Sequence, residues 1–510
     1  MGMRARRVVI GVVVGIPIAL ALATGGALVV LNSEWASRRV AHEAAAMLEA
    51  RFDGHVQVES LSMTLFPRVA VSGANLHITR ADGAAPMLEI AKFEVSGTPI
   101  ELFRRRFDRV DIDGLQIFVT RGRGQPTKLR GQLRDVRVGE VNVRNGRLVI
   151  LPDDPQKLPL EFGLQTVTLT DFRFDRSTVF AARLINPRPR ALIQTEGRFG
   201  PWQTSTPRTT PVQGVYLFHD GELDAIKGLG GHLTSSGKFD GVLERIAVEG
   251  TTTSRDFTLD LANQPMPLRT AFKATVDGTR GDVLLDDVDA TLGQSRIRAH
   301  GSVASTPGAK GRTVTLTVSM KDARFEDLLR LSVKSVEPPM QGRLDIDTGF
   351  ELPPGDEDVP QRLRLRGRFA IRGGRFANDT AQNKIDELSR RGRGEPENQD
   401  VSNVISAFGG AFTLNDGVLH LPGLRFSVRG ARVDLDGRYT LRGQGLDFIG
   451  ALRLDAPVSR TVTGFKSILL RPIDPLFRRD GAGTLLPIRV SGTVDQPAFA
   501  VDIKKALKRQ

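Results

Sequence analysis

Apolar and polar residues alternate with a period of two along most of the chain beyond residue 53. This alternation restricts the fold more than any other feature. Between Leu424 and Val428, for example, apolar residues alternate with Arg425 and Ser427. A period of two places successive side chains on opposite faces of a strand, so each such strand has one apolar and one polar face. The chain is therefore predicted to be mostly β.

Turn-forming dipeptides separate many of these alternating runs. Such dipeptides between short apolar runs are typical of hairpins and meanders, whereas parallel sheets need a helix between their strands. The sequence therefore predicts a largely antiparallel sheet. The predicted turns are Asp82-Gly83, Asn145-Gly146, Asp220-Gly221, Asp240-Gly241, Asp277-Gly278 and Asn415-Asp416-Gly417.

Few segments show helical spacing. Residues Phe325 to Val333 and Ala381 to Arg390 place apolar side chains three or four positions apart, which predicts two short helices. The polar segment Arg391 to Asp400 is predicted to be a loop or flexible insertion, and Val401 to Phe408 a further short helix.

An uncharged apolar run extends from Val8 through Leu20 to Leu31. As a helix it would be roughly 36 Å long, enough to cross a bilayer core of ~30 Å. Arginines precede it and Trp35 follows it, as is typical of membrane anchors. We expect a transmembrane segment with its N-terminal head in the cytoplasm. The alternative is a cleaved signal peptide, because Ala19, Ala21 and Ala23 offer the small-residue spacing of a cleavage site.

The net charge of +13 alone does not indicate nucleic-acid binding. Arginines are spread along the chain, often beside aspartates, and no helix-turn-helix, zinc-finger or aromatic RNA-binding motif accompanies them. A basic surface on an exported protein would face anionic lipid headgroups, or simply water. The absence of cysteine excludes disulfides and cysteine-based metal sites.

No catalytic pattern emerges from the titratable residues. The seven histidines lack ligand spacing, and His219 beside Asp220 fits a turn better than a metal or acid-base site. Neither a phosphate-binding loop nor a nucleophile elbow occurs. We therefore expect no enzyme activity, no cofactor and no metal; a tethered hydrolase with an unrecognised site is the remaining enzymatic alternative.

Segments near both ends of the chain resemble the AsmA-like family of Gram-negative envelope proteins, relatives of the bridge-like lipid transfer proteins. The middle of the chain, 121–370, matches only in its β pattern. The segments that carry the resemblance are the apolar run, Gly54 to Val58, Phe66 to Leu76, Pro99 to Arg106, Val110 to Leu115, Phe412 to Leu441, Lys466 to Phe477, Asp480 to Thr484 and Pro487 to Thr493.

The resemblance implies a transmembrane helix followed by a long curved antiparallel sheet with an open apolar groove. It also implies phospholipid transfer between the inner and outer membranes, with the bulk of the chain in the periplasm and no catalytic residues. The expected regions are a cytoplasmic head (1–7), the anchor (8–31), a membrane-proximal helix (34–52), an N-terminal AsmA-like β region (53–120), a middle groove region (121–378), a helical and loop insertion (379–408) and a C-terminal AsmA-like β region with a basic tail (409–510).

An alternating apolar face can line a groove or a dry core, as in a β-sandwich or a closed barrel. The open groove is the interpretation that the resemblance favours, with phospholipids as the bound partner. A structural or assembly factor for outer-membrane proteins or lipopolysaccharide is the alternative function; envelope protein partners stay unspecified. Replacement of Phe426 or Phe448 by aspartate is expected to reduce lipid loading. The groove candidates are Phe412, Leu414, Leu424, Phe426, Val428, Val433, Leu435, Leu446, Phe448 and Leu452.

Overall fold

The computed structural model describes most of the chain beyond residue 53. The predicted head (1–7), anchor (8–31) and membrane-proximal helix (34–52) lie outside the described residues. Among the residues that are described, no helix combines the length and the apolar character needed to cross a membrane. The described residues are 54–64, 68–80, 86–98, 106–120, 137–151, 159–461 (without 174, 188, 204–205, 227, 261, 263 and 306–310), 483–493 and 496–501.

The chain is predominantly β, with few helices, as the alternation predicts. It divides into two compact units. Unit 1 comprises residues 1–225, 233–252 and 273–283, and unit 2 comprises residues 226–232, 253–272 and 284–510.

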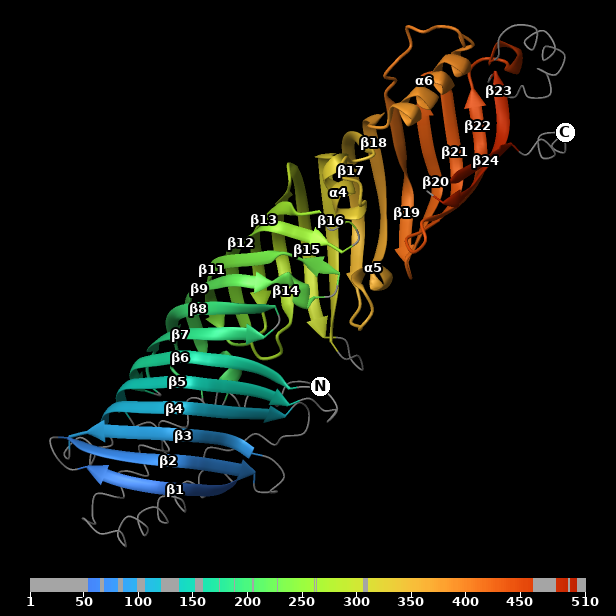
Figure 1. Ribbon diagram of the computed structural model, residues 1–510. Coiled ribbons are helices and arrows are strands. Elements are labelled where there is room, and N and C mark those ends of the chain that lie inside the picture. The colour runs from blue at the N-terminus through green and yellow to red at the C-terminus, as the bar shows by residue number, and fades with distance from the viewer. Residues whose placement is uncertain are drawn as a thin grey trace. The chain divides into compact units, whose positions relative to one another are not determined.

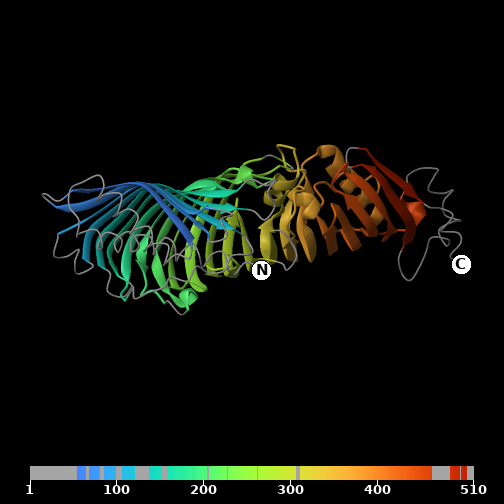
Figure 2. The ribbon, with the colours of Figure 1, turned by 90° about the horizontal axis from the view of Figure 1, so that it is seen from below.

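Consecutive strands pair in unit 1 from β1 to β9, and Figures 1 and 2 show them side by side in chain order as a twisted sheet. All of these pairs are antiparallel except β4–β5, which is parallel. No described pairing joins β1 to β9, so this sheet is open. The strands are β1 (Gly54–Thr64), β2 (Val69–Arg80), β3 (Pro86–Gly97), β4 (Arg106–Thr120), β5 (Arg137–Leu151), β6 (Leu160–Arg173), β7 (Thr178–Pro187), β8 (Arg190–Phe199), β9 (Pro211–Glu222) and β11 (His232–Val242).

Unit 2 contains an unbroken antiparallel series from β15 to β24. Strands β12 (Arg245–Leu259) and β13 (Met266–Val276) contribute residues to both units. The other strands are β10 (Leu229–Gly230), β14 (Val283–Leu292), β15 (Ser295–Ser305), β16 (Arg312–Arg324), β17 (Met340–Leu352), β18 (Arg364–Phe376), β19 (Ser406–Asn415), β20 (Val418–Val428), β21 (Ala431–Thr440), β22 (Gly445–Leu454), β23 (Thr484–Thr493) and β24 (Pro497–Val501).

Three α-helices occur among the described residues, all of them in unit 2 connections. Helix α4 (Phe325–Ser332) joins β16 to β17, α5 (Val359–Arg362) joins β17 to β18, and α6 (Asp379–Arg393) joins β18 to β19. Because antiparallel connections alternate between the two ends of the strands, α4 and α6 lie at one end and α5 at the other. The described single-turn 3₁₀ helices are η1 (Pro207–Thr209), η2 (Leu223–Ala225) and η3 (Val458–Thr461).

The predicted helices at 325–333 and 381–390 are confirmed, although α6 begins two residues earlier and ends three residues later than expected. The predicted helix at 401–408 is wrong. Residues 401–405 form no helix, and β19 begins at Ser406, where its backbone pairs with β18. The tertiary pairing outweighs the weak helical spacing of this short segment.

Several glycine-containing dipeptides lie within strands and do not form turns. Asn145 (φ 53°) lies inside β5 and Asp220 (φ 46°) inside β9, while Asp240-Gly241 precedes the end of β11. The predicted turns at these places are therefore wrong, because a left-handed residue also fits a β-bulge. The turns at Asp277-Gly278 and at Asp416-Gly417 are confirmed; Asp82-Gly83 lies outside the described residues.

Bulges change which residues face the core of unit 1. In β4, Val110 and Ile112 are buried before Gly114 (φ 70°), and Leu115 and Ile117 are buried after it. The buried positions thus switch from even to odd numbers across one left-handed residue. These side chains belong to a large buried cluster that spans β1 to β6.

Candidate functional site: an apolar sheet face

Unit 2 presents one continuous apolar face along strands β16 to β23. Cross-strand partners put Phe426 beside Val433 and Leu424 beside Leu435, and Val433 in turn lies beside Leu452. Because paired residues share a face, these side chains project to the same side of the sheet. We call this surface the apolar face.

Helix α6 covers one end of the apolar face (Figure 1). Its side chains Ile385 and Leu388 pack against a cluster of buried residues on β20 to β22, and Phe408 joins the same cluster. The rings of Phe408 and Phe426 lie 4.7 Å apart between centroids. Here the apolar face is sealed like a protein core. The buried members of the cluster are Phe426, Val428, Ala431, Val433 and Leu454.

Buried polar contacts hold α6 and the loop after it in place. The Asp386 carboxylate accepts hydrogen bonds from the backbone N–H groups of Asn403 (2.9 Å) and Val404 (2.8 Å) and from Gln382 Nε2 (2.8 Å). Ser389 Oγ donates to the Arg429 carbonyl (2.6 Å), which ties the helix to the sheet. In the segment predicted to be a loop or flexible insertion, residues 391–393 end α6 and residues 394–400 form a loop, and Asp386 anchors the chain just after it.

Helix α4 covers the same end of the neighbouring strands. Leu328 and Leu329 pack on a buried cluster that includes Leu344 and Ile371. The buried Asp327 carboxylate accepts hydrogen bonds from the Gln294 backbone N–H (3.0 Å) and from Ser295 Oγ (2.8 Å). We call the part of the apolar face beneath α4 and α6 the covered end.

At the opposite end of the same strands the described residues include only the single-turn helix α5, and the aliphatic side chains there are half-buried. We call this part the open end. Apolar surface left accessible in a contiguous patch is typical of sites that bind ligands, membranes or proteins. The half-buried members of the open end are Val314, Leu316, Phe350, Leu352, Leu365, Leu419, Leu421, Leu446 and Val490.

All ten groove candidates lie on the apolar face, but the structure divides them. Phe426, Val428 and Val433 are buried beneath α6, and Leu435 and Leu452 pack against that cluster. Candidates nearer the open end are Leu424 and Leu446, which are half-buried, and Phe412, Leu414 and Phe448, which are buried. Contact of any of them with lipid stays a prediction.

Sequence reasoning missed the open-end residues of β16 to β18, although the alternation of leucine and arginine at 363–366 signals one of these strands. Leu365 lies beside Phe350 on β17 and Leu414 on β19, so β16 to β18 extend the same apolar face.

The opposite face of these strands is polar and carries cross-strand ion pairs. Asp434 lies between Arg425 and Arg453 (3.8 and 3.7 Å), and Asp447 lies between Arg438 and Arg489 (3.2 and 3.3 Å). Each carboxylate thus bridges arginines from the two strands beside it. This face suits water, so the apolar character is confined to one side of the sheet.

Several charged groups of unit 2 are shifted in pKa by their hydrogen-bond partners. A hydrogen bond from the backbone N–H of Asp322 (2.7 Å) lowers the pKa of Asp345, and Arg372 lowers it further. The hydrogen bond to Asp347 raises the pKa of Lys321. A hydrogen bond from His232 (2.7 Å) lowers the pKa of Asp256.

Acidification should destabilise β17 through Asp345. Because the folded-state pKa lies below the unfolded value of ~3.9, Asp345 stabilises the fold above that pH, and this contribution is lost as pH falls through the folded pKa. We expect urea unfolding midpoints to fall between pH 7 and pH 3, and to fall less in Asp345→Asn. Asp289→Asn, on an exposed ion pair, is the control; equal slopes in wild type and Asp345→Asn would contradict the assignment.

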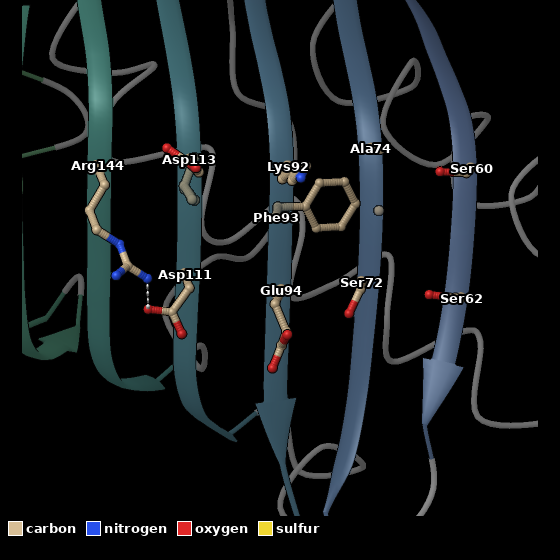
Figure 3. A pocket seen from close by; sticks show the side chains of 12 residues that line it. Ser60, Ser62, Ser72, Ala74, Lys92, Phe93, Glu94, Asp111, Asp113 and Arg144 are labelled. Carbon is tan, nitrogen blue, oxygen red and sulfur yellow. Dashed lines mark ion pairs between the residues drawn. The ribbon is translucent and has the colours of Figure 1, made fainter.

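A polar pocket of about 330 Å³ lies on β1 to β5 of unit 1 (Figure 3). Serines, carboxylates, Lys92 and Arg144 line it, and Arg144 lies 3.9 Å from Asp111. The ring of Phe93 belongs to the buried cluster and occupies the space beside Gly73.

The titratable residues singled out in the sequence do not assemble into a reactive site. His219 and Asp220 lie at a bulge near the end of β9, and the adjacent Asp286 and Asp287 are exposed on β14. Across the described parts of the chain, no three His, Asp or Glu side chains gather as metal ligands would.

Comparison with known proteins adds no relative. No family profile matches the chain, and no curated protein and no solved structure is significantly similar to it.

Proposed function

We propose that this chain binds phospholipids on its apolar face and supports their transfer between two membranes. The observation that carries the proposal is the open end, where half-buried aliphatic side chains line one side of a sheet whose other side is charged. A surface of this kind can shield an acyl chain while the headgroup stays in water.

The energetic benefit of such shielding is large. Exposure of hydrocarbon to water costs ~0.8 kcal/mol per CH₂, so a 16-carbon acyl chain entering water alone faces roughly 12 kcal/mol. An apolar sheet face lowers this barrier without chemistry, which fits a chain in which no catalytic constellation was recognised. The apolar run at residues 8–31 and the resemblance to AsmA-like proteins support placement in a Gram-negative envelope, with an inner-membrane anchor and the bulk in the periplasm.

Native mass spectrometry of the full chain, purified in mild detergent, tests the proposal. We expect bound phospholipid in the wild type and a several-fold lower load in Leu446→Asp, because a carboxylate at the open end disfavours hydrocarbon. Ile449→Asp is the matched control, since Ile449 lies on the same strand, faces the opposite side and is half exposed (51%).

Phospholipid absent from the wild type, or retained equally in both variants, would contradict lipid binding at the open end. The first outcome would favour a structural or assembly role for the same fold. Phe426 and Phe448 are poorer test positions, because they are only 9% and 6% exposed and a buried aspartate would destabilise the sheet.

A further inference from the structure

Unit 1 carries a row of hydroxyl groups across four neighbouring strands on the side that otherwise bears apolar residues. Thr195 on β8 is the cross-strand partner of Tyr216 on β9. Tyr216 Oη lies 3.3 Å from Ser235 Oγ on β11, and Ser235 Oγ lies 3.1 Å from Thr252 Oγ1 on β12. We call these four residues the hydroxyl row; all four are half-buried.

Apolar side chains flank the hydroxyl row on the same side of the sheet. Ile193, two residues before Thr195 on β8, is the cross-strand partner of Phe218, two residues after Tyr216 on β9. The ring of Tyr216 packs beside Gly237, and the ring of Phe239 packs beside Gly214. The ring of Tyr216 therefore lies against the sheet, and the Tyr216 hydroxyl oxygen is surrounded by a largely apolar surface.

Each hydroxyl proton of the row is donated in a hydrogen bond, either to another hydroxyl of the row or to a backbone carbonyl. Thr195 Oγ1 donates to the Val215 carbonyl (2.9 Å), and Ser235 Oγ donates to the Thr251 carbonyl (3.1 Å). Thr252 Oγ1 donates to Ser235 Oγ, which leaves Tyr216 as the donor in its bond to Ser235. Ser235 is thus saturated, whereas the oxygens of the other three residues keep free lone pairs.

A partner for these lone pairs must supply hydrogen-bond donors. We infer that the hydroxyl row binds the donor-bearing headgroup of a phospholipid, through an amine N–H or a hydroxyl O–H, while acyl chains lie on the neighbouring apolar residues. The inference rests on the proposed function and adds to it a second lipid-binding surface, in unit 1, with a preference among lipids. A headgroup without donors, such as choline, would leave the oxygens unpaired.

The test presents the full-length protein with mixed micelles that contain equal amounts of dioleoyl phosphatidylethanolamine, phosphatidylglycerol and phosphatidylcholine. Native mass spectrometry reports the bound lipids. We expect a donor-bearing lipid to be enriched about fivefold over phosphatidylcholine, the factor that one net hydrogen bond provides. Enrichment of phosphatidylethanolamine identifies the amine as the donor, and enrichment of phosphatidylglycerol identifies the hydroxyl.

The double variant Tyr216→Phe/Thr252→Val keeps ring and side-chain volume but removes two acceptor oxygens. We expect its enrichment to fall at least twofold with the total lipid load unchanged; Thr195 remains as an acceptor, as does Ser235, whose lone pairs the variant releases. Thr253→Val is the matched control on the adjacent, outward position of β12 and should keep the wild-type ratio. Unselective binding by the wild type, or full enrichment in the double variant, overturns the inference alone; absence of any bound lipid overturns the proposed function with it.

Discussion

Leu344→Ala should lower the local stability of β17 by about 3 kcal/mol, the typical cost of a buried leucine truncation with its residual cavity. Leu344 is 1% exposed, lies beside Ala323 and Ile371 on the neighbouring strands and packs in the cluster beneath α4. Hydrogen–deuterium exchange of the β17 amides measures the loss, because local opening reports local stability.

Leu352→Ala is the matched control for this truncation. Leu352 belongs to the same strand and the same face as Leu344, but lies at the open end and is half-buried. We expect it to cost about 1 kcal/mol or less, because little additional surface loses contact. Equal losses in the two variants would mean that both ends are sealed, and would contradict an accessible open end.

Asp386→Ala should release the loop at residues 394–405 from α6. The carboxylate accepts three hydrogen bonds, two of them from backbone N–H groups. If these N–H groups stay buried in the variant, no water can replace the carboxylate as their acceptor. Charge-assisted bonds contribute about 1.5–3 kcal/mol each, and their losses are not additive, so we expect a local destabilisation of about 3 kcal/mol. Faster exchange of the Asn403 and Val404 amides is the measurement.

Glu387→Ala provides the comparison for Asp386→Ala on the next position of the helix. Glu387 forms an exposed i,i+4 ion pair with Arg391 (2.6 Å), which is worth about 0.3–0.5 kcal/mol. We expect almost no change in loop exchange. Protection of Asn403 and Val404 that persists in Asp386→Ala would show that other contacts hold the loop.

The alternation was sufficient to predict a mostly β, largely antiparallel chain, the strands between Phe412 and Leu454 and which of their residues share an apolar face. Two short helices were also predictable, because Ile385 and Leu388 keep helical spacing whatever they pack against. Period and spacing are local properties, so they are readable from a single sequence.

The remaining features depend on which strands become neighbours. No local pattern shows that α6 covers Phe426 but not Leu446, since both residues alternate in the same way. The left-handed Asn145 looked like a turn because turns and bulges use the same residue types. The hydroxyl row could not be predicted either, because strand register alone brings Tyr216 and Ser235 into contact.

The consecutive pairing of strands also bears on how each unit folds. In β15 to β24 every described ladder joins sequence neighbours, so most contacts form over short chain separations for an all-β protein. Low contact order favours rapid folding, and nearest-neighbour stabilisation allows growth by addition of one hairpin at a time. A sheet of this kind can gain or lose a hairpin in evolution without rebuilding a shared core.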